Sequence, residues 1–167
     1  MMTNAENKAV RKKNRLQEYD YSLPGTYFIT ICTKEHRNYF WESVGASSAR
    51  PQEVCLSAYG KMVDEAIKSI HGYYSVISVD HYVVMPNHVH LLIQINADEY
   101  GRRMPSPSVS RIVQHMKGYV TKQIGFSVWQ KSFHDHIVRG KQDYEKILDY
   151  IENNPSKWSE DKFYIEL

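Results

Sequence analysis

The chain has 167 residues, of which 42% are hydrophobic and 24% are charged, and its formal net charge is +2. This length favours one domain with an ordinary core and excludes two full-sized domains. No apolar run approaches the roughly 18 residues needed to span a bilayer, and the polar, basic N-terminus is not a secretory signal, so we expect a cytoplasmic protein without a membrane partner.

The first half of the chain predicts an arm, a strand and a helix. Residues 1–20 are basic and predict a mobile N-terminal arm, which leaves residues 21–167 as a single domain. β-Forming residues fill positions 26–33 and predict a strand, and small polar residues at 43–52 predict a loop. Apolar residues then recur at helical spacing over 57–70, which predicts an amphipathic helix.

The second half predicts three strands and two helices. Strands are expected at 75–85 and 88–95, joined by a tight reversal, and a third at 128–138. A helix capped by Ser108 is expected between the second and third of these strands, and a last helix over 142–154. The resulting order, β-α-β-β-α-β-α, predicts an α+β fold: a ferredoxin-like split βαβ antiparallel sheet with an additional C-terminal helix on its open face.

The strand at 88–95 carries a His-x-His pattern. Because side chains alternate along a strand, His88 and His90 project from one face and are close enough to bind one metal ion, whereas Val89 and Leu91 point into a core. Two imidazoles leave such an ion coordinatively open, which suits catalysis better than a closed structural site. Two partly exposed imidazoles without a metal are the alternative interpretation.

The last helix offers candidates for a third ligand and a nucleophile. Tyr150 and Asn154 are four residues apart and therefore share one helix face, at the edge of the apolar stripe. Asn154 could provide an amide oxygen ligand and Tyr150 a phenolic nucleophile. The chain has 13 tyrosines, so packing is the competing interpretation of Tyr150. His134 and His136 form a second His-x-His pattern, which competes with the first on spacing alone.

Basic residues gather in the second half of the chain, among many aromatic residues. This combination suits single-stranded nucleic acid, where cations meet phosphates and rings stack on bases, although a solvated surface would explain any one charge equally well. The candidate DNA-binding residues are Arg102, Arg103, Arg111, Lys117, Lys122 and Arg139.

Five blocks of sequence together resemble the HUH single-tyrosine transposases, and most closely the branch associated with repetitive extragenic palindromes (REP). The blocks cover nearly the whole chain from about residue 11, in the family's order. They are YDYSLPGTYFITICT at 19–33, VVMPNHVHLLI at 83–93, HMKGY at 115–119, WQKSFHDHIVR at 129–139 and YIENNPSKW at 150–158.

This resemblance implies a bacterial, nucleoid-associated enzyme that cuts and rejoins single-stranded DNA near hairpins through a 5′-phosphotyrosine. Carried over by position, His88 and His90 match the paired metal ligands, Tyr150 the nucleophile and Asn154 the carboxamide ligand. The block containing His134 and His136 is assigned to support or DNA contact. Nitrogen and oxygen ligands of this kind suit Mn²⁺ or Mg²⁺. The resemblance leaves open a monomer or a homodimer that exchanges the tyrosine helix.

Two other functions remain open at this point. A noncatalytic nucleic-acid-binding module would bind DNA unaffected by Tyr150→Phe and form no covalent adduct. A metallohydrolase that activates water at His88 and His90 would still cleave DNA after loss of Tyr150.

Overall fold

The computed structural model describes residues 19–42 and 55–166. The predicted arm, apart from residues 19 and 20, and the predicted loop at 43–52 lie outside this part of the chain. Within the described residues, no helix combines the length and the apolar character needed to cross a membrane.

A four-stranded antiparallel sheet forms the centre of the molecule, in the order β2-β3-β1-β4. Its strands are β1 (Gly25–Cys32), β2 (Ile77–Val84), β3 (His88–Ile95) and β4 (His134–Ile137). The central strands β1 and β3 pair along their whole length, with Cys32 opposite His88 at one end. The α+β fold and the central position of the first and third strands are therefore confirmed.

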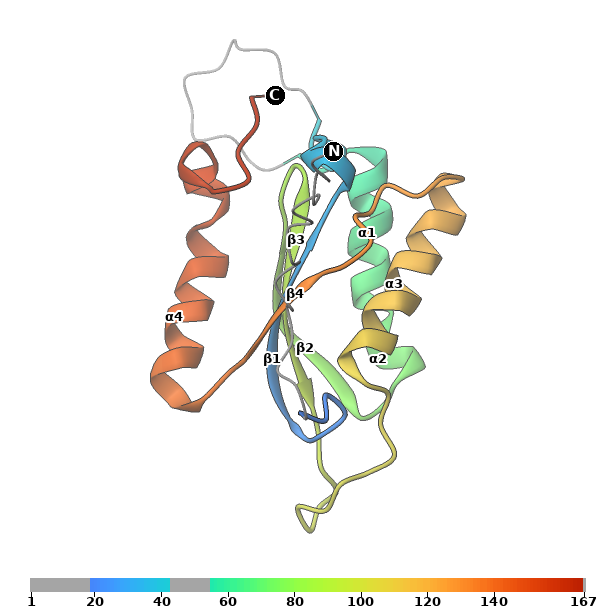
Figure 1. Cartoon of the computed structure of the whole chain (residues 1–167), viewed down its shortest axis with the longest axis vertical. Coiled ribbons are helices and arrows are strands. Elements are labelled where there is room, and N and C mark those ends of the chain that lie inside the picture. Colours follow the sequence, from blue (N-terminus) through green and yellow to red (C-terminus); the bar gives the residue numbers. More distant parts are fainter. Residues whose placement is uncertain (1–18, 43–54, 167) are drawn as a thin grey trace, which may run out of the picture.

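Helices α1 (Ala58–Lys68), α2 (Ile70–Tyr73) and α3 (Val109–Ile124) cover one face of the sheet (Figure 1). Alternate residues of the central strands, such as Val89 and Leu91, pack against them in the main core. A short 3-10 turn, η1 (Lys34–His36), follows β1. This side of the molecule buries most of the apolar residues and fixes the position of β3.

The opposite face of the sheet receives α4 (Gly140–Asn153), which Figure 1 shows alone on that side. Leu92 of β3 forms a second, smaller core with Ile147 and Ile151 of this helix. A 3-10 segment, η2 (Pro155–Glu160), continues from the helix, and the chain then returns toward the start of β3. The even-numbered positions of β3 therefore lie under α4.

Two predicted elements differ in the structure. The helix expected at 57–70 is interrupted at Ser69, whose hydroxyl donates to the carbonyl of Ala66 and competes with the helical pattern there. The strand expected at 128–138 is wrong in extent, because only His134–Ile137 forms β4. Residues 128–133 instead place Trp129 in the main core, and their β-bridge joins Trp129 to Thr33, the residue after β1.

Candidate active site

β3 presents two buried histidines to the α4 side of the sheet. His88 and His90 are 0% and 1% exposed, and their Nε2 atoms lie 3.0 Å apart. The intervening Val89 belongs to the core on the other face. The shared orientation expected from strand alternation is therefore present, with both Nε2 atoms turned toward one point.

The other ring nitrogen of each histidine has its own partner. Nδ1 of His88 lies 2.9 Å from the Asn87 side-chain oxygen, and Nδ1 of His90 lies 2.9 Å from the Thr30 hydroxyl. Asn87 comes from the turn before β3, and Thr30 from the paired position on β1. These contacts at Nδ1 orient both rings, so that their Nε2 atoms face the site.

Helix α4 brings Tyr150 to the same place. The phenolic oxygen of Tyr150 lies 3.3 Å from Nε2 of His90, and the two rings meet edge to face. The Tyr150 ring also makes an edge-to-face contact with the ring of Phe28, a β1 residue that stacks on His90. The apolar residues of α4 pack on Leu92, and this packing places Tyr150, the predicted nucleophile, beside His90.

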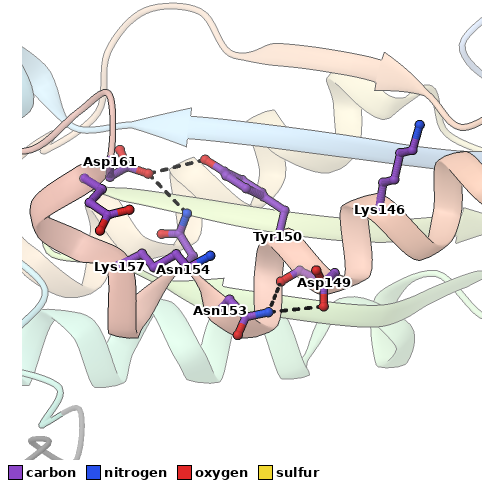
Figure 2. A pocket seen from close by; sticks show the side chains of 8 residues that line it. Lys146, Asp149, Tyr150, Asn153, Asn154, Lys157 and Asp161 are labelled. Atoms are coloured by element: carbon purple, nitrogen blue, oxygen red, sulfur yellow. Dashed lines mark hydrogen bonds between the residues drawn. The ribbon is translucent and has the colours of Figure 1, made fainter.

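Asp161 completes the group, and sequence analysis missed it. Its Oδ2 lies 4.0 Å from Nε2 of His88 and accepts a 3.3 Å hydrogen bond from the Tyr150 hydroxyl (Figure 2). The donor atoms of His88, His90 and Asp161 all lie within 4.8 Å of one another. Pro155 suggested that the last helix simply stops, and nothing in the local pattern predicts that the chain turns back through η2 to the histidines.

Asn154 lies beside Asp161, and within the described part of the chain only one end of its side-chain amide is hydrogen-bonded. Its side-chain nitrogen donates to Asp161 Oδ2 over 3.1 Å (Figure 2), and the residue is only 5% exposed. Its Oδ1 is buried and has no hydrogen-bond partner among the described residues. A buried carbonyl oxygen left unpaired is costly, so a water molecule or a cation at this atom would stabilise the site.

These residues fit a divalent cation. Two ligand atoms placed about 2.1 Å from one octahedral ion are themselves about 3 Å apart, and this matches the spacing of the two Nε2 atoms. Imidazole nitrogens together with the oxygens of Asp161 and Asn154 form a mixed donor set suited to Mn²⁺ or Mg²⁺. The unpaired Oδ1 of Asn154 is the observation that most directly favours a bound ion.

Burial keeps both histidines neutral. It lowers the pKa of His88 strongly, although the charge of Asp161 opposes the shift. Burial, together with the neighbouring His88, also lowers the pKa of His90 well below its usual value. Because a metal binds the unprotonated imidazole, these shifts keep the ligands in the competent form at neutral pH.

The Tyr150 hydroxyl is protonated at neutral pH. Burial raises its pKa to about 12, and the negative charge of Asp161 adds to the shift. A phenol in this state is a weak nucleophile and requires a base or a nearby cation for activation. The neighbouring Asp161 carboxylate can accept its proton, and a cation bound by the histidines would favour the phenolate.

A pocket of about 300 Å³ opens beside Tyr150 on the α4 side (Figure 2). It is lined by Lys146, Asp149, Tyr150, Asn153, Asn154, Lys157, Glu160 and Asp161. Two exposed lysines, Lys146 and Lys157, thus border the tyrosine, and neither was among the residues predicted to contact DNA. Lys146 lies one turn before Tyr150 on α4, whereas Lys157 lies on η2, beyond the end of that helix.

Three of the predicted DNA-binding residues lie on α3, across the sheet from Tyr150. Arg111 and Lys122 are exposed there. Lys117 is instead half-buried, and its ammonium donates to the backbone carbonyls of Gln130 and Ser132. The structure does not bring these three residues to the histidine face.

The other three predicted residues also lie apart from the histidines. Arg102 forms an ion pair with Asp98 in the loop after β3, and Arg103 bonds Asp20 and Ser22. Arg139 is exposed at the start of α4. DNA contact by any of these residues stays a prediction.

The second His-x-His pattern lies on β4, at the edge of the sheet. Thr30 pairs with His90 on one side and with His134 on the other, so His134 faces the same side of the sheet. His136 bonds the carboxylate of Asp143 near the start of α4 over 2.8 Å. This pairing favours the predicted supporting role, because it ties β4 to the helix that carries Tyr150.

Comparisons with known proteins identify the family of this chain. The family described as "Transposase IS200 like" matches residues 25–154. A protein of uncharacterized function from Haemophilus influenzae (strain ATCC 51907 / DSM 11121 / KW20 / Rd) is 30% identical, covering 93% of this chain and 94% of its own length. A second protein from that strain, named "Putative REP-associated tyrosine transposase", is 22% identical over 83% of this chain and 74% of its own length.

A solved structure shows the same fold. It is a REP-associated tyrosine transposase bound to a REP hairpin, with a TM-score of 0.60 and 21% sequence identity. The similarity covers 86% of this chain and 73% of that one. The family match spans the strand that carries both histidines and the helix that carries Tyr150, and it reaches Asn154. The chain therefore belongs to the IS200-like transposase family.

Proposed function

We propose that this protein is a metal-dependent single-stranded DNA endonuclease and strand transferase that forms a 5′-phosphotyrosine intermediate near DNA hairpins. The observation that carries the proposal is the position of the Tyr150 hydroxyl, 3.3 Å from Nε2 of His90 and 3.3 Å from Asp161 Oδ2. A packing tyrosine has no need of these neighbours. A nucleophile needs both a proton acceptor and a cation site beside it.

His88, His90, Asp161 and Asn154 would hold the divalent ion, either Mn²⁺ or Mg²⁺. When bound, such an ion supplies Lewis acidity to a phosphate oxygen and stabilises charge on the departing oxygen. The chain's own part is to orient these ligands and to hold Tyr150 next to them. The aromatic rings of Trp158 and Phe163 pack around His88 and exclude water from that side.

In the proposed reaction, the Tyr150 oxygen attacks the phosphorus of the scissile phosphodiester. Its proton passes to Asp161, whose carboxylate already accepts the hydroxyl hydrogen. The bond from phosphorus to the 3′ oxygen breaks, so the products are a 5′-phosphotyrosine and a free 3′-hydroxyl strand. Attack by a 3′-hydroxyl on the phosphotyrosine reverses these steps and rejoins DNA without ATP, because the bond energy is kept in the covalent link.

Hairpin DNA is the proposed substrate because a relative of the same fold is bound to a REP hairpin. The lysines that border the pocket support this choice. Lys146 and Lys157 place two positive charges on either side of Tyr150, where the phosphates next to the scissile bond would lie. The same proposal includes a single domain over 21–167. This domain would work in the bacterial cytoplasm, as a monomer or a homodimer.

The test is incubation of the protein with end-labelled single-stranded hairpin DNA and Mn²⁺, followed by a denaturing gel. Wild type should give a protein-linked DNA band, and Tyr150→Phe and His88→Ala should lose it. Tyr144→Phe is the matched control, since Tyr144 is a half-buried tyrosine on the same helix outside the pocket, and it should keep the band. Cleavage that persists in Tyr150→Phe would instead make water the nucleophile.

A further inference from the structure

The side chain of Asn87 is fully hydrogen-bonded and fully buried. Its amide nitrogen donates to the carbonyl of His36 over 3.0 Å and to the carbonyl of Phe163 over 2.8 Å. Both amide hydrogens are therefore used, and the remaining oxygen is the atom that faces Nδ1 of His88. That oxygen can only accept, so Nδ1 of His88 must carry a hydrogen and Nε2 of His88 must present a lone pair to the site.

The partner of His90 is different in kind. Nδ1 of His90 faces the hydroxyl of Thr30, which is 5% exposed and can either donate or accept. Thr30 alone therefore does not fix which nitrogen of His90 carries the hydrogen. The deciding contact is on the other side of the ring, where Nε2 of His90 lies 3.0 Å from Nε2 of His88, which presents its lone pair.

In the metal-free protein this contact requires a hydrogen on Nε2 of His90. Two nitrogen lone pairs facing each other at 3.0 Å would repel, whereas an N–H from His90 makes a hydrogen bond to His88. The Thr30 hydroxyl then donates to Nδ1 of His90. The Tyr150 hydroxyl is not needed in this contact, because it donates to Asp161.

A cation between the two histidines requires a different arrangement. Both Nε2 atoms must then present lone pairs, so the hydrogen of His90 has to move to Nδ1. One proton leaves Nε2 for solvent and one is taken up at Nδ1, so the ring stays neutral. The Thr30 hydroxyl rotates from donor to acceptor, which a threonine side chain can do without moving its heavy atoms.

We propose that Asn87 and Thr30 are positioning residues with distinct tasks: Asn87 locks His88 in the Nδ1–H tautomer, and Thr30 allows His90 to exchange tautomer when the site takes its divalent cation. This inference deepens the proposed function and rests on the cation site described there. It assigns to the metal-free protein a hydrogen bond between Nε2 of His90 and Nε2 of His88. Binding of the ion must break that hydrogen bond.

The direct test is two-bond ¹H–¹⁵N correlation NMR on the full chain with ¹⁵N-labelled histidine, free and with saturating Mg²⁺, with no DNA present. The inference predicts that His88 shows the Nδ1–H tautomer in both spectra. His90 should show Nε2–H in the free protein and Nδ1–H with Mg²⁺. A His90 that keeps one tautomer in both spectra, or a His88 protonated at Nε2, would overturn it.

A pair of variants tests Thr30 independently. Thr30→Val removes the hydroxyl at nearly constant volume and should weaken Mn²⁺ binding, followed by electron paramagnetic resonance, by about 10- to 100-fold. Thr30→Ser restores a hydroxyl and should recover most of that affinity. Thr33→Val is the control, because Thr33 is likewise a buried threonine, directly after β1, but its hydroxyl donates to the Arg37 carbonyl and not to a histidine.

These outcomes separate the inference from the proposed function. Wild-type Mn²⁺ affinity in Thr30→Val would overturn the task given to Thr30, whatever the protein does to DNA. Correct tautomers and affinities without a covalent DNA adduct would leave this inference standing and would remove the tyrosine mechanism.

Discussion

The hydroxyl of Tyr150 lies 3.3 Å from Nε2 of His90, although 60 residues separate the two in the chain. β3 holds the histidine in the middle of the sheet, and α4 crosses the same face with Tyr150 at the edge of its buried stripe. The contact therefore depends on the packing between α4 and the sheet as much as on the two residues themselves.

Asp161→Asn should weaken Mn²⁺ binding by about tenfold or more, because a charged oxygen is replaced by a neutral one of the same size. The pKa of Tyr150 should fall at the same time, since the Asp161 charge contributes to its rise. Mn²⁺ titration followed by electron paramagnetic resonance measures the first effect. Asp149→Asn, which removes an exposed carboxylate from the same pocket, should leave Mn²⁺ affinity unchanged.

Leu92→Ala should destabilise the protein by about 2–5 kcal/mol and loosen α4 in particular. Leu92 is fully buried and forms the second core with Ile147 and Ile151. Hydrogen exchange should show reduced protection in α4 before the rest of the chain. Leu91→Ala offers the comparison, because Leu91 is the next residue of β3 and packs on the other face. Equal loss of α4 protection in both variants would contradict this account of the docking.

Two glycines in helices should respond to alanine with opposite signs. A methyl group at Gly60 of α1 would collide with the carbonyl oxygen of Phe40, so Gly60→Ala should cost about 2 kcal/mol. A methyl group at Gly118 of α3 would meet nothing within 4 Å. Gly118→Ala should therefore gain about 0.5–1 kcal/mol from helix propensity alone. Urea unfolding of both variants measures the two values, and equal signs would refute the argument.

Lys117 should make stability depend on pH in the alkaline range. Burial lowers its pKa from the ordinary 10.5 to about 8. Between these values the unfolded chain binds more protons than the folded one, so this residue makes stability rise as pH increases from about 8 to 10.5. In Lys117→Met this contribution should be absent, and stability relative to wild type should decline across that window.

The comparison for Lys117 is Lys122→Met, a change at an exposed lysine of the same helix. Its stability should run parallel to wild type over the same pH range. Urea unfolding at intervals across the window provides the measurement. Parallel curves for Lys117→Met and wild type would show that the ammonium is not desolvated in the folded state.

Strand alternation was sufficient to predict the orientation of His88 and His90, because a period of two is a local property of the backbone. The helix face shared by Tyr150 and Asn154 follows in the same way. Asp161 could not be predicted, since its position depends on how η2 turns after Pro155 and on the contact of Phe163 with His88. Those are tertiary contacts without a periodic signature.

Charge clustering does not predict where a residue lies relative to the histidines. Arg111, Lys117 and Lys122 were selected in this way, and they lie on α3, which covers the other face of the sheet from α4. Proximity in sequence does not determine which side of a sheet a helix covers. The prediction did not include Lys146 and Lys157, and the positions of α4 and η2 showed that these two lysines border the pocket.

The most direct test of the tyrosine mechanism is mass spectrometry of the protein–DNA adduct after nuclease and trypsin digestion. Cleavage after Lys146 and Lys157 releases residues 147–157, a peptide that contains Tyr150 as its only tyrosine. We predict that this peptide carries a nucleotide through its 5′ phosphate, with fragment ions that place the modification on Tyr150. Cleaved DNA with an unmodified peptide, or with the nucleotide on another residue, would contradict the assignment of Tyr150 as the nucleophile.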